Sequence, residues 1–355
     1  MKRTFTIAVA GGMSLLAAGY AAAQSLGGFP IREPGAHSGS GSPGPGAKPA
    51  KGPMQIIVDA NGPGPYKTIS AAVKDVAEGG MVYVMHGVYN ESVTINKSIL
   101  IQGDRGPGSG VEIIAPANEP CMTFAPTIGT SHAVVANISM QSKVNSRPSA
   151  CLDIGSGVFT LRESNVMGST LAPSIRVAGG TAVLEKNTIA QGSQGIVLAQ
   201  PHTLSQAFIV DNKITGNQVG VDITNVSRGD VVVSGNEIFK NQSKGVASSG
   251  YGATMLIGNK IRNNTGSGVM LERYTKLALV RYNEIVSNDG DGVEIPSGVN
   301  GLIEENQIVG NRGASIVIHS GAAPKITNNV ISNNGGDRSG KKSKKTKVKD
   351  EWTRP

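Results

Sequence analysis

Short alternating stretches of apolar and polar residues run along most of the chain and repeat with a period of about 23 residues. From residue 165 an Asn-x-aliphatic element recurs. Its copies begin at Asn165, Asn187, Asn212, Asn236, Asn259, Asn283, Asn306 and Asn329. Each copy continues with a small residue, an apolar-x-apolar segment such as Val221–Ile223, and a third apolar segment such as Val231–Val233. Three short strands per repeat predict one turn of a right-handed parallel β-helix.

Stacked turns place equivalent residues about 4.8 Å apart, so repeated residue types form columns. A second Asn column stands five residues after the first, at Asn217, Asn241, Asn264, Asn288, Asn311 and Asn334. We expect Asn to adopt the left-handed backbone of a tight turn and to hydrogen-bond to the Asn one turn away. A Gly column (Gly195, Gly220, Gly245, Gly268 and Gly292) is expected to supply positive φ angles.

The register extends toward the N-terminus and places the two cysteines, Cys121 and Cys151, in one column on adjacent turns. A disulfide is one prediction, because an exported protein meets an oxidising compartment. Two stacked reduced thiols are the alternative, because direct neighbours on parallel strands often have poor disulfide geometry. The fold class predicted is therefore all-β, a right-handed parallel β-helix of about ten turns over residues 54–336.

Residues 56–103 resemble the start of pectinesterase-like and other pectin-lyase-like β-helix proteins, in which a short helix caps the first turn. The likeness rests on 66–73 (Tyr-Lys-Thr-Ile-Ser-Ala-Ala-Val) and on Gly87-x-Tyr89-x-Glu91. Residues 69–77 also form an amphipathic helix pattern behind a possible Thr68 cap. The resemblance covers roughly residues 55–334 and implies the fold together with work on carbohydrate. Many functions share this scaffold, so it does not define one activity.

Catalytic motifs of these families are missing from the chain. The pectinesterase-like pattern matches only at Gly87, Tyr89 and Glu91, and the Asp-rich and Gly-His-Gly elements of polygalacturonase-like proteins have no counterpart. The epimerase-like Asp-Pro-His-Asp finds only Pro201-His202. The sequence therefore leaves open whether the protein is a lyase, a glycoside hydrolase, a uronate epimerase or no enzyme.

One outer face of the predicted helix carries the remaining candidate chemistry. Glu272 and Glu294 fall on adjacent turns, offset by two residues, which gives a separation of roughly 8 Å and fits an inverting glycosidase. Tyr251 and Tyr274 are expected to stack beside them and to hold a sugar ring. The further substrate-binding candidates on this face are Asp222, Arg273 and His319. An ordinary solvated outer sheet is the alternative interpretation.

A turn at residues 288–292 crowds two carboxylates, Asp289 and Asp291, and could hold Ca²⁺. Asp and Gly are also common turn residues, and no ladder of carboxylates continues onto adjacent turns. We therefore expect no cofactor, with Ca²⁺ as the alternative at this turn.

The net charge of +8 lies outside the predicted helix. Residues 1–23 read as a bacterial signal peptide, 24–53 as a disordered Gly/Pro/Ser-rich spacer and 337–355 as a basic disordered tail. The leader's two basic residues, the spacer and the tail contribute +2, +2 and +5, which leaves −1 for residues 54–336. The tail is expected to meet an anionic envelope surface or a partner protein. No transmembrane span is expected after processing, and nucleic acid is not expected as a partner of an exported chain.

Two functions follow as hypotheses. The first is an exported, periplasmic or secreted protein that binds, and could process, an acidic or other polysaccharide along the Glu272/Glu294 face. The second is a structural protein of the cell envelope or surface, tethered by its basic tail.

Overall fold

The computed structural model describes residues 52–105, 110–143, 150–199, 205–226, 230–250, 252–272 and 277–338. The predicted signal peptide, nearly all of the spacer and nearly all of the basic tail lie outside these residues. The described residues belong to one compact unit. None of the described helices is long and apolar enough to cross a membrane.

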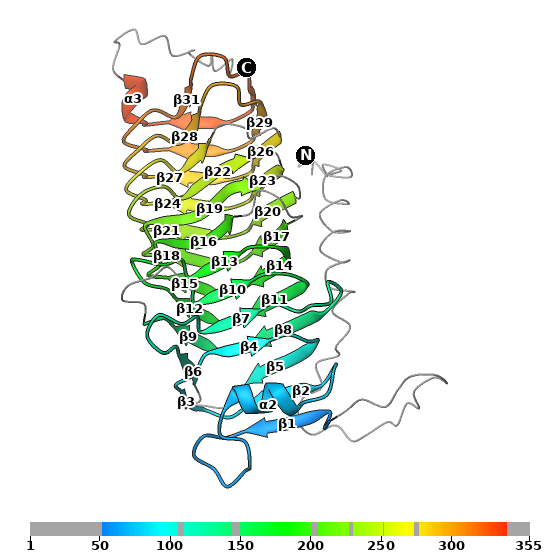
Figure 1. Ribbon diagram of the computed structural model, residues 1–355. Helices are drawn as coiled ribbons and strands as arrows, with labels where there is room; N and C mark the ends of the chain where they lie inside the picture. Colours follow the sequence, from blue (N-terminus) through cyan, green and yellow to red (C-terminus); the bar gives the residue numbers. More distant parts are fainter. Residues whose placement is uncertain are drawn as a thin grey trace, which may run out of the picture. The chain divides into compact units, whose positions relative to one another are not determined.

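Three parallel sheets wind around one interior, and each turn of the chain adds one strand to each sheet (Figure 1). Successive strands pair in parallel with the equivalent strand of the previous turn, as in β11 with β14 and β14 with β17. This arrangement confirms the all-β parallel β-helix predicted from the repeat.

Sheet A has 12 strands and runs the full length of the helix. Its strands are β1 (Gln55–Val58), β2 (Met81–Val84), β5 (Ile99–Gly103), β8 (His132–Ala136), β11 (Val158–Arg162), β14 (Gly180–Glu185), β17 (Ser205–Val210), β20 (Asp230–Ser234), β23 (Ala253–Ile257), β26 (Leu277–Arg281), β29 (Gly301–Glu304) and β32 (Lys325–Thr327).

Sheet B has 11 strands and follows sheet A through a short turn. Its strands are β3 (Gly87–Tyr89), β6 (Val111–Ile114), β9 (Ser139–Gln141), β12 (Asn165–Met167), β15 (Thr188–Ala190), β18 (Lys213–Thr215), β21 (Glu237–Phe239), β24 (Lys260–Arg262), β27 (Glu284–Val286), β30 (Gln307–Val309) and β33 (Val330–Ser332).

Sheet C has 10 strands. They are β4 (Val93–Ile95), β7 (Met122–Phe124), β10 (Leu152–Ile154), β13 (Ile175–Val177), β16 (Gln194–Ala199), β19 (Val219–Val226), β22 (Val246–Gly250), β25 (Val269–Leu271), β28 (Val293–Ile295) and β31 (Ile316–Ile318). Two helices lie at the ends of the described chain, α2 (Ile69–Asp75) and α3 (Gly335–Arg338).

From Asn187 and Asn217 onward the two Asn columns form continuous hydrogen-bond ladders that are almost fully buried. Asn165, which the sequence placed first in its column, is instead an exposed residue of β12 that pairs with Thr188, and Ser164 takes the ladder position by donating its backbone N–H to Asn187.

In the first ladder, the Nδ2 of Asn259 donates to Oδ1 of Asn283 at 2.9 Å, and the backbone N–H of Asn259 donates to the same oxygen at 2.9 Å. The second amide proton of Asn259 goes to the carbonyl of Val233 at 2.8 Å. The second ladder repeats this pattern, as between Asn264 and Asn288. Each side chain thereby satisfies buried backbone groups that a tight turn leaves unpaired.

The left-handed residue of each turn is not the ladder Asn, as the sequence suggested, but the residue before it. Lys186, Asp211 and Tyr282 precede ladder residues and have φ angles of 55°, 54° and 58°. Gly235 and Gly258 take the same position on the intervening turns with φ angles of 67° and 65°. The prediction was wrong because the Asn side chain must point inward to bond its neighbours, and the reversal of the chain therefore falls one residue earlier.

The Gly column also has a different physical reason from the one expected. None of its members adopts a positive φ. A Cβ atom at Gly245 would lie 2.6 Å from Cγ2 of Ile261 and 2.7 Å from the carbonyl oxygen of Gly268 on the next turn. Glycine is required here because the backbone enters sheet C in close contact with the ladder turn and leaves no room for a side chain.

The capping helix α2 is fixed by residues of the pectinesterase-like element. Thr68 caps the helix by accepting from the N–H of Ala71 at 3.3 Å. Glu91 accepts from the N–H groups of Ile69 and Ser70 at 2.7 and 2.9 Å, beside the positive end of the helix dipole. Tyr89 is buried and donates to the carbonyl of Met85 at 2.8 Å. In this chain the Tyr89 and Glu91 side chains therefore hold the cap in place.

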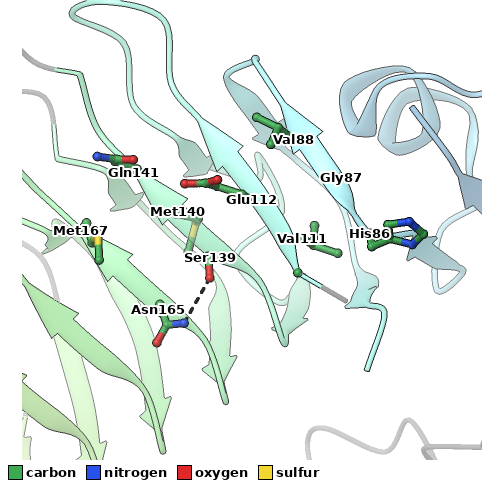
Figure 2. A pocket seen from close by; sticks show the side chains of 11 residues that line it. His86, Gly87, Val88, Val111, Glu112, Ser139, Met140, Gln141, Asn165 and Met167 are labelled. Atoms are coloured by element: carbon green, nitrogen blue, oxygen red, sulfur yellow. Dashed lines mark hydrogen bonds between the residues drawn. The ribbon is translucent and has the colours of Figure 1, made fainter. Parts of the chain in front are cut away.

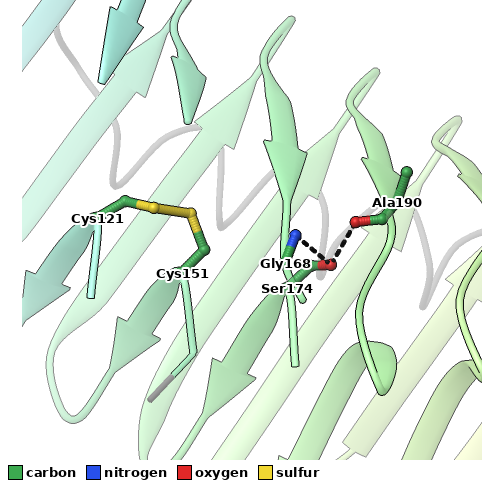
Figure 3. The surroundings of a disulfide bond; sticks show 5 residues. All are labelled: Cys121, Cys151, Gly168, Ser174 and Ala190. Atoms are coloured by element: carbon green, nitrogen blue, oxygen red, sulfur yellow. Dashed lines mark hydrogen bonds between the residues drawn. A yellow bond between two sulfur atoms is a disulfide. The ribbon is translucent and has the colours of Figure 1, made fainter. Parts of the chain in front are cut away.

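A disulfide joins Cys121 and Cys151 at the entry to β7 and β10, with a Cα–Cα distance of 4.7 Å (Figure 3). Both residues are buried. On the following turns the hydroxyl of Ser174 accepts from the N–H of Gly168 at 3.2 Å and donates to the carbonyl of Ala190 at 2.9 Å. A covalent bond and a hydroxyl bridge therefore tie these turns together on the N-terminal side of the Asn217 ladder.

Candidate functional site

The outer face of sheet C carries charged residues among small and apolar ones. Strand register places its outward residues in one column, namely Asp153, Arg176, Val197, Asp222, Ala247, Met270, Glu294 and Val317. Near the N-terminal part of this column, Arg176 forms a bidentate pair with Asp153, whose Nε–Oδ1 distance is 2.9 Å. Short strands pack their apolar alternate residues inward, so the outward residues are free to carry chemistry.

A charged cluster occupies the middle of the face. Asp222 lies on β19 and accepts a hydrogen bond from the hydroxyl of Thr224. Lys244 stands two residues before the first residue of β22, and its Nζ lies 2.8 Å from Oε1 of Glu272, which follows β25. Three successive turns thus supply Asp222, Lys244 and Glu272, and we call these three residues the acid–lysine cluster.

Within this cluster the pKa of Asp222 responds to burial and to its charged neighbours. Burial raises the pKa of Asp222 above its ordinary value, and the negative charge of Glu272 raises it further. The hydrogen bond from Thr224 and the positive charge of Lys244 act in the opposite direction on this pKa but do not cancel the rise. Such a carboxyl beside a lysine can exchange a proton or accept and donate hydrogen bonds to a polar ligand.

Glu294 forms a separate group at the C-terminal part of the face. Its Oε1 lies 3.4 Å from Nε2 of His319, and its Oε2 accepts from the hydroxyl of Ser267 at 3.4 Å. The structure therefore brings His319 to Glu294, in line with the sequence expectation that placed them on one face. Among the described residues Glu272 pairs with Lys244, while Glu294 pairs with His319.

Three of the predicted substrate-binding residues, Tyr251, Arg273 and Tyr274, lie outside the described residues. The calcium candidates lie on the B-to-C turn, where Asp291 accepts from the N–H of Ala314 at 2.6 Å. Within the part of the chain that is described, no three His, Cys, Asp or Glu side chains gather closely enough to hold a metal ion.

Lys244 is the main residue of the site that the sequence analysis missed. It stands directly before the Gly column, at a position occupied by Val219 and Ser267 in other turns. The signal was available in the repeat, since a lone lysine at this position points toward the outward column of sheet C. Its importance depends on Glu272 on the next turn, which single-strand patterns do not reveal.

A second candidate region is a shallow hollow on the outer face of sheet B near the N-terminal end (Figure 2). Its volume is about 470 Å³, and it spans β3, β6, β9 and β12. Glu112, Ser139 and Asn165 line it beside the half-exposed Val88 and Met167, and Asn165 donates to Ser139 at 3.1 Å. Sequence patterns missed this hollow because its residues come from four different turns.

Comparison with known proteins gives a family model and several structures. The model for the right handed beta helix region matches residues 194–349. No curated protein matches the chain in sequence. The crystal structure of the Dettilon tailspike protein is similar at a TM-score of 0.57 and 12% identity, over 79% of this chain and 62% of that one.

Two further structures are similar at lower scores. The ORF18 protein of Geobacillus virus E2 has a TM-score of 0.49 and 14% identity, over 79% of this chain and 61% of its own. The mannuronan C-5 epimerase A-module of Azotobacter vinelandii has a TM-score of 0.36 and 13% identity, over 72% and 90%. The chain thus spans about three fifths of the length of the tailspike and ORF18 proteins.

These likenesses concern architecture, because the identities are low. The three-sheet winding, the Asn ladders and the match to the family model agree with one another. The chain is a right-handed parallel β-helix.

Proposed function

We propose that this protein binds a polysaccharide along the outer face of sheet C, with the acid–lysine cluster at the centre of the binding site. The observation that carries the proposal is the convergence of Asp222, Lys244 and Glu272 from three successive turns, with Lys244 Nζ 2.8 Å from Glu272. A sugar presents hydroxyl donors and acceptors along an extended chain, and this face offers both kinds of partner over several turns.

The resemblance to pectin-lyase-like proteins supports carbohydrate as the ligand class. An acidic polymer is the preferred class within it, because Lys244 and Arg176 offer cationic groups that pair well with a uronate carboxylate. Both cations are held by carboxylates, Glu272 and Asp153, so an incoming carboxylate would exchange with a protein group.

Export of the protein forms part of the proposal. The disulfide between Cys121 and Cys151 supports an oxidising location such as the periplasm or the cell exterior. The apolar stretch near the N-terminus, which lies outside the described residues, supports the same destination.

Processing of the polymer is a second, more demanding activity at the same site. Asp222 supports it, because a carboxyl whose pKa is raised by burial keeps its proton to a higher pH than an exposed carboxyl does, as a general acid must. A hydrolase would also need a water or a nucleophilic carboxylate on the other side of the bond, and Glu272 is the nearest candidate.

The test is isothermal titration of the full chain against polyuronates and neutral glucans, with product analysis of the same samples. We expect binding that weakens in Lys244→Ala and Glu272→Gln. Glu112→Gln, which removes the carboxylate of the hollow on sheet B, serves as the matched control and should bind as the wild type does. Absence of binding to every polymer would contradict the proposal, and loss of binding only in Glu112→Gln would move the site to the hollow.

A further inference from the structure

The outer face of sheet A is unlike the faces of sheets B and C. Its middle outward column reads Leu100, Val134, Thr160, Val183, Phe208, Val232, Met255, Leu279 and Leu302. Only Thr160 interrupts the apolar series. The equivalent column of sheet B includes Glu112, Ser139, Asn165, Thr188, Lys213, Glu237, Lys260, Glu284 and Gln307. We call the sheet A series the apolar column.

The apolar column lies outside the interior. Alternate residues of the same strands, such as Ala207 and Ile209 on β17, belong to the interior cluster, while Phe208 between them does not. Phe208, Met255, Leu279 and Leu302 are half-buried, and the smaller Val183 and Val232 between larger neighbours are 3% and 4% exposed. No described helix or strand packs across this face from β5 to β29, since α2 contacts β1, β2 and β4 at the N-terminal end.

A second outward column flanks the apolar one and carries opposite charges at its two ends. Toward the N-terminal end it holds Arg162 and Glu185, and toward the C-terminal end Arg281 and Glu304, whose Nε and Oε1 atoms lie 3.2 Å apart within the chain. Val210, Ser234 and Ile257 lie between the two pairs. The Nε of Arg162 is buried and finds no hydrogen-bond partner among the described residues.

The order of these residues is self-complementary about Ser234. A twofold axis parallel to the strands, lying over β20, reverses the order of turns in a second copy. Arg162, three turns before Ser234, then faces the Glu304 of the other copy, three turns after it. Glu185 faces Arg281 two turns from the axis, and Val210 faces Ile257 one turn from it.

The same axis matches the apolar column with itself from Thr160 to Leu302, whereas Val134 faces Lys325 and Leu100 has no counterpart. Phe208 faces Met255, Val183 faces Leu279, and Val232 faces its own copy. The two sheets then pack face to face with aligned strands, which is a common packing of β-sheets. Residue i of one copy contacts residue j of the other and the reverse also holds, as an isologous interface requires.

The matched area lies at the low end of stable interfaces. About the axis over β20 the apolar column overlaps its copy over seven turns, β11 to β29, and strands of about five residues then give a patch of roughly 34 by 17 Å. That is roughly 600 Å² on each copy, against the ~800 Å² per partner of standard interfaces. We infer that the outer face of sheet A is the interface of a twofold-symmetric, antiparallel dimer of this chain.

The first test is chemical cross-linking at the axis. Both native cysteines are in the disulfide, so Ser234→Cys adds the one free thiol of the described residues. Facing sheets lie about 10 Å apart, so a short bismaleimide should join two copies through residue 234. Thr188→Cys, outward and half-buried on sheet B, is the matched control and should stay unlinked. The mass of the wild type, measured by light scattering, should be twice that of one chain.

The second test exchanges charges on one predicted pair. Arg162→Glu should raise the dissociation constant of the dimer by about tenfold, because the new glutamate of each copy then faces Glu304 of the other copy. The double variant Arg162→Glu with Glu304→Arg should recover affinity relative to either single variant. Six turns, about 29 Å, separate the two residues within one chain, so their direct contact inside a monomer cannot account for the recovery.

Three outcomes would overturn the inference. A monomeric wild type that gives no cross-link at residue 234 excludes the dimer. If that monomer also protects the apolar column from surface labelling, the chain before Gly52 covers the face instead. A dimer that is insensitive to Arg162→Glu and unlinked through residue 234 uses another surface. Efficient cross-linking together with charge-swap recovery supports the antiparallel interface.

Discussion

Sheets A and C line the same interior, but their outer faces differ in chemical character, apolar on sheet A and charged on sheet C. Inward residues of both sheets are aliphatic, as in Ile209 on β17 and Ile223 on β19. Outward, sheet A shows Phe208, Val232 and Met255, whereas sheet C shows Asp222 and Glu294 with Lys244 beside them. The repeat therefore fixes the interior of every turn, while the outward positions are independent and can support two separate roles.

The largest effect is expected from a substitution in the Asn ladder, because the ladder holds together the turns that carry both faces. Asn259→Ala removes the two hydrogen bonds that the Asn259 amide donates to the Val233 carbonyl and to Asn283. It also removes the oxygen that accepts from the backbone N–H and the side-chain amide of Asn236. Buried groups left without partners should lower the free energy of unfolding by about 2–4 kcal/mol. Chemical denaturation measures this value.

The control for the ladder change is Asn165→Ala on the exposed side of sheet B, where the loss should stay within about 0.5 kcal/mol. Equal losses in the two variants would mean that the ladder contributes no more than an ordinary surface amide does.

A charge on the apolar column should affect only association. Phe208→Asp puts two carboxylates into the proposed dimer interface, and we expect the dissociation constant to rise by about a hundredfold. Met270→Asp makes the comparable change on sheet C and should leave the mass unchanged. Sedimentation at several concentrations measures both. If Met270→Asp dissociates the dimer and Phe208→Asp does not, the roles of the two faces are reversed.

A change in the acid–lysine cluster should affect only ligand binding. Lys244→Ala removes the cation beside Glu272 and should weaken polyuronate binding by about tenfold, which corresponds to one lost charged hydrogen bond. Titration calorimetry measures the affinity, and light scattering should return the wild-type mass. Lys260→Ala on sheet B is the control for loss of a positive charge and should bind normally.

The smallest effect is a difference in the pH dependence of stability. Burial raises the pKa of Asp222 above its ordinary value of 3.8, so the folded state holds this proton more tightly than the unfolded state. The wild type therefore loses stability as the pH rises from this ordinary value through the raised pKa. An amide side chain does not titrate, so Asp222→Asn should be as stable as wild type near pH 3 and more stable at pH 7. The difference at pH 7 should be less than about 1 kcal/mol. Thermal unfolding at the two pH values measures it, and a less stable variant at pH 7 would mean that the carboxylate is favoured in the folded protein.

The fold could be predicted from the sequence because each repeated residue contacts only its own turn and the equivalent residue of the next turn. Asn, Gly and aliphatic residues recur at fixed spacing, and each describes a contact with its own copy. The reasons assigned to the columns were partly wrong, since Asn259 forms the ladder without a left-handed backbone and Gly245 is needed for close packing. Dihedral preference and steric space give the same residue choice, so composition alone does not separate them.

The candidate site was only partly predictable. Asp222, Glu272, Glu294 and His319 were placed on one face, but which of them interact depends on side-chain direction across turns. Glu272 pairs with Lys244, a residue from a turn corner that strand patterns do not include. The apolar column of sheet A shows the same limitation, because it is visible only after the register of successive strands is known.

The direction of the Asn ladders has a consequence for how this protein can change in length. A ladder amide with an Asn on either side donates toward the next turn and accepts from the previous one, as Asn236 does from Asn212 and toward Asn259. An inserted copy of one repeat would find a donor on one side and an acceptor on the other, so the ladder would close around it. Duplication or loss of a whole turn therefore leaves the hydrogen bonds of the ladder intact. A turn gained or lost between β11 and β14, or between β26 and β29, would give the Arg162–Glu304 and Glu185–Arg281 pairs different twofold axes, so a dimer across sheet A would disfavour changes of length at those two places.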